Sequence, residues 1–215
     1  MTPKLLSAIM LFVAVVFLST TWSHGQDQTA GQKPKPPVPA ALEQAQPAAA
    51  TSVKSAAEKY FSDVELLNQD GQKMRFYSDV LKNKVVIINT FFTTCTSVCP
   101  PMNRNMEKMQ EALGVRLGKE AFLVSISVDP ETDTPPRLKE YSRRFHAREG
   151  WMFLTGKKEN VDWALYKLGQ YVEARDDHST IIIIGNEPKG LWKKAFGLAK
   201  PDELVKIVED VINDR

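Results

Sequence analysis

The chain has 215 residues, of which 43% are hydrophobic and 25% charged, a composition typical of a globular protein with a substantial core. This length favours one domain with accessory segments. The formal net charge is only +2, and no long basic run with interleaved aromatic residues occurs. The composition therefore gives no electrostatic basis for nucleic-acid binding, and we expect no nucleic-acid partner.

The N-terminal residues have the pattern of an export signal. A single lysine precedes the apolar run LLSAIMLFVAVVFL (5–18), and a polar stretch follows. The run fits a signal peptide cleaved after Gly25, whereas extension to Trp22 gives just enough length for a membrane anchor. We therefore expect residues 1–25 to be a signal peptide or an N-terminal membrane anchor. Both alternatives place the domain outside the cytoplasm, in the periplasm or anchored to a membrane and facing the periplasm.

The next segment, 26–57, is dominated by Pro, Ala and Gln and shows no convincing apolar period. Such a composition is typical of a flexible, semi-extended tether. The globular domain is then expected to span residues 58–215.

The domain begins with a β-hairpin pattern and continues as alternating strands and helices. Asp70-Gly71, between two short stretches, is a signal for a tight turn. The later strand patterns are runs of apolar, β-branched and aromatic residues. The hairpin and strands are expected at 64–76, 85–92, 122–128, 151–154, 180–184 and 191–196.

Helical patterns separate most of these strands. Because proline is tolerated in the first turn of a helix, Pro100 and Pro101 predict a helix that opens directly after Cys99. Further helices are expected after Thr134, after Asn160 as an N-cap, and near Pro201. Apolar residues at helical spacing define the buried face of the first helix: Met102, Met106, Met109 and Leu113.

Strands alternating with helices call for an α/β fold. We expect a mixed, mainly parallel central sheet flanked by helices, with the hairpin at its N-terminal end. Loops at strand ends cluster on one side of such a sheet, where ligands bind.

The two cysteines, Cys95 and Cys99, lie between a buried strand and the start of a helix. Unpaired backbone N–H groups and the helix dipole favour an anion at this place, so thiolates form more readily. Two cysteines in an exported protein also form structural disulfides. However, a bridge across three intervening residues restricts the unfolded chain only weakly. The position therefore favours a reactive pair that binds a soft metal ion or forms a reversible disulfide.

Three histidines could supply a further ligand. His24 lies in the leader, and His146 lies among charged residues near a helix end, which is typical of a solvated side chain. His178 directly precedes a buried strand, but a lone histidine is more often structural. Periodicity alone does not show whether its loop faces the cysteines. Its neighbours Asp176 and Asp177 are either solvated loop charges or acceptors for its second ring N–H.

Four segments resemble the Sco/SenC family of copper-binding, thioredoxin-like proteins, in the family's order and approximate spacing. They are FFTTCTSVCPPM, VSISVDPETDTPPRLKEYSRRF, GWMFLTG and DDHSTIIII. The resemblance covers about 61–215 and implies a thioredoxin-like fold. One departure is Gly185-Asn186, where the family usually has an aspartate before a turn.

The resemblance also implies the site. Cys95 and Cys99 would bind copper as thiolates and form a redox-active disulfide, and His178 would bind it as an imidazole. Asp129, the aspartate of the SVDP motif, would lie near the copper; a turn or cap at the strand end is the alternative. Soft sulfur selects Cu(I), and imidazole accepts Cu(I) or Cu(II). The methionines of the following helix also carry soft sulfur, but their spacing favours a place in the core.

The family's role implies a metallochaperone that delivers copper to, or prepares the cysteines of, the copper A site of cytochrome c oxidase. The expected partners are the copper A subunit, other copper chaperones and thiol–disulfide reductants. We expect a binding and transfer protein rather than an enzyme. The alternative is an extracytoplasmic thiol–disulfide oxidoreductase using Cys95 and Cys99, although such sites usually have two intervening residues. A thioredoxin-like peroxidase is a third class, for which only Arg104 suggests an activating arginine.

Overall fold

The computed structural model describes residues 35–43 and 55–213. The predicted leader and most of the predicted tether lie outside the described residues. Two short helices, α1 (Ala40–Glu43) and α2 (Ala56–Phe61), precede the sheet, and Leu42 packs against the core. Within the described ranges, no helix has the length and apolar character needed to cross a membrane. The division into leader, tether and domain stays a prediction.

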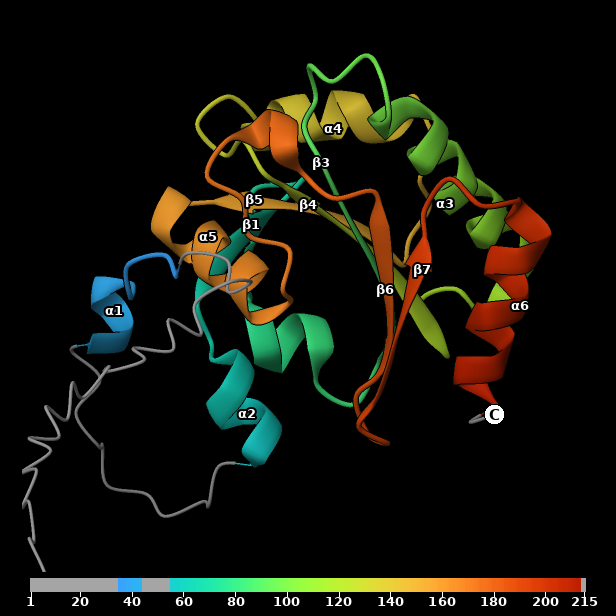
Figure 1. The fold of residues 1–215 in the computed structure, drawn as a ribbon, viewed down its shortest axis with the longest axis horizontal. Helices are drawn as coiled ribbons and strands as arrows, with labels where there is room; N and C mark the ends of the chain where they lie inside the picture. Colours follow the sequence, from blue (N-terminus) through green and yellow to red (C-terminus); the bar gives the residue numbers. More distant parts are fainter. Residues whose placement is uncertain (1–34, 44–54, 214–215) are drawn as a thin grey trace, which may run out of the picture. The chain divides into compact units, whose positions relative to one another are not determined.

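A seven-stranded sheet runs through the domain in the order β2-β1-β5-β4-β3-β6-β7 (Figure 1). The strands are β1 (Glu65–Asn68), β2 (Lys73–Arg75), β3 (Val85–Phe91), β4 (Ala121–Ser127), β5 (Trp151–Gly156), β6 (Ile181–Asn186) and β7 (Leu191–Phe196). The expected hairpin, the expected strands and the α/β class are thus confirmed.

The sheet is mixed and mainly parallel in strand direction, as expected: β2, β3, β4, β5 and β7 run one way, and β1 and β6 run the other way. Among neighbouring strands, only β3–β4 and β4–β5 pair parallel, and the other four pairs are antiparallel. Two of the antiparallel pairs, β1–β2 and β6–β7, are hairpins at the two edges of the sheet, whose adjacent strands are necessarily antiparallel. The other two arise because β1 and β6 run against the strands that they border, β5 and β3.

Helices cover both faces of the sheet (Figure 1). One face packs against α3 (Cys99–Leu113), α4 (Pro135–Arg143) and α6 (Pro201–Ile212). The other packs against α2, a π-helix at Phe76–Leu81 that follows the first hairpin, and α5 (Lys158–Lys167). Alternation along β3 supplies both cores, because Ile87 faces the first layer and Val86 and Ile88 face the second.

Two predicted helix features have different outcomes. The methionines of α3 are core residues, as their spacing predicts: Met102, Met106 and Met109 are 0%, 0% and 1% exposed. The predicted N-cap Asn160 is wrong, because α5 begins at Lys158. The side chain of Asn160 instead donates from Nδ2 to the carbonyl oxygen of Glu65 at 2.9 Å, so it ties α5 to β1.

Candidate metal centre

The cysteine loop, residues 92–98, connects β3 to α3. Cys95 lies in this loop, and its N–H donates to the carbonyl oxygen of Phe92 at 3.1 Å, which folds the chain into a tight turn. Cys99 is the first residue of α3, with prolines in the first helical turn as expected. Both residues are free thiols and both are buried, Cys95 at 7% and Cys99 at 0% exposure.

The histidine loop, residues 174–180, includes one 3-10 turn at Arg175–Asp177 and leads into β6. Because β6 pairs antiparallel with β3, the start of β6 lies beside the end of β3, where the cysteine loop begins. His178 therefore reaches the cysteines. Its Nε2 lies 3.1 Å from the Sγ of Cys99.

The three donor atoms of Cys95, Cys99 and His178 lie within 4.8 Å of one another. In the part of the chain that the structure describes, this is the one such group of three or more His, Cys, Asp or Glu side chains. Two sulfurs and one imidazole nitrogen, all buried, form a soft donor set that fits a thiophilic metal ion. The structure thus answers the question that periodicity left open: the histidine loop faces the cysteines.

The ring of His178 is oriented by its surroundings. Its Nδ1–H donates to the carbonyl oxygen of Arg175 at 3.0 Å, which leaves Nε2 toward the cysteines. The ring of Phe92 packs edge-on against the imidazole, with centroids 5.2 Å apart. The acceptor is thus a backbone carbonyl and not Asp176 or Asp177, which are exposed.

The environment shifts the pKa values of the three donor groups in different directions. Burial, together with the hydrogen bond to Cys95, raises the pKa of the Cys99 thiol. Burial also opposes ionisation of Cys95, but hydrogen bonds from Cys99 and from two backbone N–H groups outweigh it, so the pKa of Cys95 is lowered. Burial lowers the pKa of His178 against the opposing hydrogen bond to Arg175. Metal binding at this site therefore has to displace the proton of Cys99.

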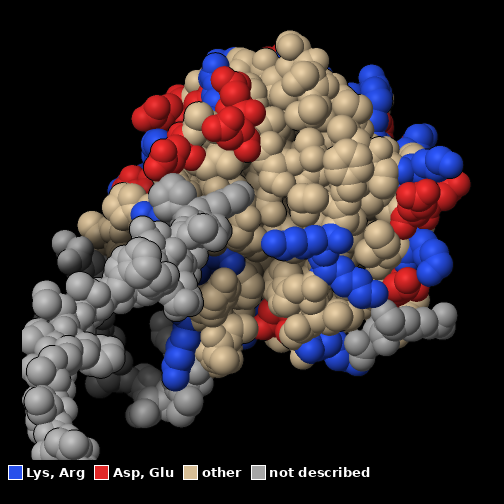
Figure 2. Space-filling model, viewed as in Figure 1, with Lys and Arg blue, Asp and Glu red and all other residues tan. Residues whose placement is uncertain are grey.

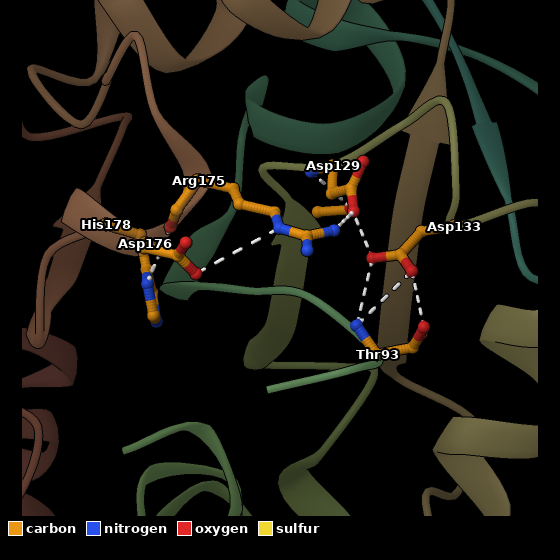
Figure 3. Close-up of polar contacts among 7 residues, drawn as sticks. Thr93, Asp129, Asp133, Arg175, Asp176 and His178 are labelled. Atoms are coloured by element: carbon orange, nitrogen blue, oxygen red, sulfur yellow. Dashed lines mark hydrogen bonds and ion pairs between the residues drawn. The ribbon is translucent and has the colours of Figure 1, made fainter. Parts of the chain in front are cut away.

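Asp129 lies in the turn after β4, as the alternative reading of its motif predicts. Its carbonyl oxygen accepts the N–H groups of Thr132 and Asp133 at 3.1 and 2.9 Å. Its carboxylate bonds Nη1 of Arg175 at 2.5 Å, and it is not a member of the convergent donor group (Figure 3). The contact between Asp129 and the histidine loop therefore runs through Arg175.

Two residues of this neighbourhood were missed by sequence reasoning. Asp133 is completely buried and accepts hydrogen bonds from Thr93 and Ser127. Arg175 contacts both Asp129 and the ring of Phe92. The second aspartate of the SVDPETD segment was the available signal for Asp133, whereas nothing local distinguishes Arg175.

The other candidate side chains lie apart from the centre. His146 is largely exposed, and its Nδ1 lies 2.6 Å from the carboxylate of Glu107. Arg104 is exposed and also faces Glu107, at 3.9 Å, so it gives no support for a peroxidase. The cysteine loop itself carries no charged residue. Figure 2 shows an uncharged area at the top of the viewed face, where Figure 1 places this loop.

Comparison with known proteins gives the family. The SCO1/SenC family model matches residues 52–213. The SCO1 protein homolog of Bacillus subtilis is 32% identical over 146 residues, which are 66% of this chain and 68% of that protein. A putative copper-binding protein of Stutzerimonas stutzeri is 31% identical over 112 residues, 52% of this chain and 53% of that protein. The chain thus spans about half the length of this relative, as it does for Rickettsia SCO2-like proteins.

The crystal structure of a SCO1/SenC family lipoprotein from Bacillus anthracis superposes with a TM-score of 0.58 at 27% identity. The match covers 68% of this chain and 91% of that one. The fold is therefore thioredoxin-like, as the resemblance implied. With a family match over most of its length, this chain belongs to the SCO1/SenC family.

Proposed function

We propose that this chain binds one copper ion through Cys95, Cys99 and His178, and that it delivers copper to, or prepares the cysteines of, the copper A site of cytochrome c oxidase. The observation that carries the proposal is the convergence of three soft donor atoms within 4.8 Å, two from the cysteine loop and the first residue of α3 and one from the distant histidine loop. The name of the Stutzerimonas relative, a putative copper-binding protein, supports the same metal.

The donor set suits a carrier of copper. Two thiolates favour Cu(I), and an imidazole accepts Cu(I) or Cu(II). Three protein ligands leave a fourth coordination position open, whereas a structural zinc site fills all four tetrahedral positions with protein ligands. An acceptor thiolate can use this position before the donor ligands leave. The cysteine loop around Cys95 has no charged residue of its own, which lowers the cost of removing water when such an acceptor approaches.

Anaerobic titration of the reduced protein with Cu(I), in competition with a chelator of known affinity, tests the proposal. The wild-type protein should take up one equivalent. Loss of an outer partner of a metal ligand costs about 10–100-fold in affinity, so loss of a ligand in His178→Ala should cost at least as much. His146→Ala is the matched control, because His146 is largely exposed and bonds Glu107 outside the donor group. No uptake by the wild-type protein, or equal losses in both variants, would overturn the assignment.

The delivery role needs its own test. Cells without the protein should lose cytochrome c oxidase activity in copper-poor medium, and added copper or the wild-type gene should restore it. Cys95→Ser with Cys99→Ser should not restore it. Unchanged oxidase activity in the deletion strain would remove this oxidase as the target while leaving copper binding intact.

The location of the protein is part of the proposal. The N-terminal sequence supports export, with the domain in the periplasm or anchored to a membrane facing it. Mass spectrometry of the intact protein from fractionated cells gives both the compartment and the presence or absence of residues 1–25. Recovery of the full-length chain in the cytoplasmic fraction would contradict export.

A thiol–disulfide oxidoreductase is the second candidate. The two free sulfurs lie close enough that a small rearrangement would join them, and one is more accessible than the other. His178→Ala separates the two functions: it should abolish tight copper binding while the Cys95–Cys99 disulfide still forms and is still reduced. An oxidoreductase role leads if reduction of substrate disulfides is fast and the wild-type protein takes up no copper.

A further inference from the structure

The turn between β4 and α4, residues 129–133, contacts both the cysteine loop and the histidine loop. Figure 3 shows its two carboxylates pointing in different directions, Asp133 toward Thr93 and Asp129 toward Arg175. Thr93 belongs to the cysteine loop, and Arg175 belongs to the histidine loop. One short turn therefore joins two segments that are far apart in sequence.

The arm formed by Asp133 is buried. Its carboxylate accepts the Thr93 N–H at 3.1 Å, the Thr93 hydroxyl at 2.5 Å and the Ser127 hydroxyl at 2.6 Å. Thr93 lies two residues before Cys95, so these bonds hold the start of the cysteine loop. Loss of a partner would leave a buried carboxylate unsatisfied, which is costly, and this arm is therefore expected to stay closed.

The arm formed by Asp129 is partly exposed and acts through Arg175. The guanidinium group bonds Asp129 and lies over the ring of Phe92, 5.2 Å from its centroid. The side chain of Arg175 is 45% exposed and that of Asp129 is 11% exposed. The carbonyl oxygen of the same Arg175 accepts the Nδ1–H of His178. An ion pair in contact with solvent is weak, so this is the arm that opens more easily.

We propose that residues 129–133 form a two-armed clamp that sets the distance between the cysteines and His178, with an arm on the histidine side that opens first. Asp129 and Arg175 are positioning residues and not ligands. This inference rests on the proposed copper site. It assigns an order to copper release: the imidazole leaves when the Asp129–Arg175 pair opens, while Asp133 still holds the cysteine loop for exchange with an acceptor thiolate.

A double-mutant cycle tests the histidine arm. Asp129→Asn and Arg175→Gln should each lower copper affinity by about 10–100-fold, as expected for partners that orient a ligand. The double variant should lose no more than Arg175→Gln alone, because Asp129 acts only through its contact with Arg175. The Cu(II) absorption and EPR spectra of the single variants should shift toward weaker imidazole coordination. Arg175→Lys, which keeps the charge, should recover part of the affinity only when Asp129 is present.

Glu209→Gln is the matched control. It breaks another partly exposed pair, Arg116–Glu209, which joins α6 to the segment after α3 and does not contact the donor group. It should change neither the affinity nor the spectra. Additive losses in the cycle would show that Asp129 acts independently of Arg175, for example as a ligand, and would overturn the clamp.

Hydrogen exchange of the reduced, metal-free protein tests the clamp independently of copper binding, so it shows which of the two proposals is wrong. Asp129→Asn should speed exchange at the amides of Asp177 and His178, which bond the carbonyl oxygens of Ala174 and Arg175. It should leave the amide of Cys95 unchanged. Asp133→Asn, or the milder Thr93→Ala, should speed exchange at the amide of Cys95 and leave the amides of the histidine loop unchanged. Unchanged exchange in all variants would overturn the clamp even if copper binds, and the predicted pattern would support it even if copper does not.

Discussion

The Sγ atom of Cys99 lies 3.1 Å from Nε2 of His178, although 79 residues separate the two in the chain. Antiparallel pairing of β6 with β3 brings them together, because it places the entry to one strand beside the exit from the other. The contact is buried, so it also links the protonation of these side chains to the stability of the fold. Four predictions follow from this arrangement and from the packing around it.

His178 should make the metal-free protein less stable in mild acid. Burial lowers the pKa of its imidazole in the folded state. Below the unfolded value of about 6.5, the unfolded chain binds a proton that the folded chain does not bind, so the free energy of unfolding falls as the pH falls. The stabilisation is complete above about pH 6.5 and is lost as the pH falls through the folded pKa. Urea unfolding at pH 5.5 and 7.5 should show a smaller difference for His178→Gln than for the wild-type protein; equal differences would contradict the prediction.

Cys95 should react with alkylating reagents before Cys99. Its pKa is lowered while that of Cys99 is raised, and it is 7% exposed whereas Cys99 is completely buried. The thiolate is the reactive form, so we expect labelling of Cys95 to be at least about tenfold faster near pH 7.5. Iodoacetamide labelling of the reduced protein, read by peptide mass spectrometry, measures both rates. Cys99→Ser serves as the single-thiol control, and preferential labelling of Cys99 would reverse the assignment.

Met106 should act as a core residue and not as a copper ligand. It is 0% exposed and belongs to the hydrophobic core under α3. Met106→Ala should lower the free energy of unfolding by about 2–5 kcal/mol, and Met106→Leu by less than about 1.5 kcal/mol. Chemical denaturation measures both values. The copper affinity of the Met106→Leu variant should equal that of the wild-type protein, and a large loss of affinity in a stable variant would identify the thioether as a ligand.

Gly150 should not tolerate a side chain. Its φ angle is +94°, and a Cβ atom there would lie 2.5 Å from the backbone nitrogen of Gly118. Gly190 is the matched control, because its φ is also positive, at +64°, but a Cβ atom there would have no neighbour within 4 Å. Gly190→Ala isolates the conformational cost, about 1 kcal/mol or somewhat more. Gly150→Ala should cost clearly more in thermal or urea unfolding, since the backbone of both segments must also move.

Local patterns in the sequence were sufficient to predict most of the helices and strands. The apolar run at 85–92 predicts a strand because a strand buried on both faces needs no polar alternation, and β3 occupies that place. The prolines after Cys99 predict the start of α3 because the first helical turn has no use for their missing N–H groups. The Sco/SenC resemblance implied the fold and the three donor residues. Asn160 was misread because cap preference is weak evidence beside tertiary contacts.

Contacts between distant segments were decided only by the tertiary structure. The pairing of β6 with β3 places His178 at the cysteines, and no period within either segment encodes that pairing. The partner of Asp129 is Arg175, from a loop whose position depends on the whole sheet. Which neighbouring strands pair parallel and which antiparallel likewise depends on the strand order of the whole sheet. Sequence patterns report which face of each element is buried, whereas the meeting of two loops depends on how all the buried faces pack together.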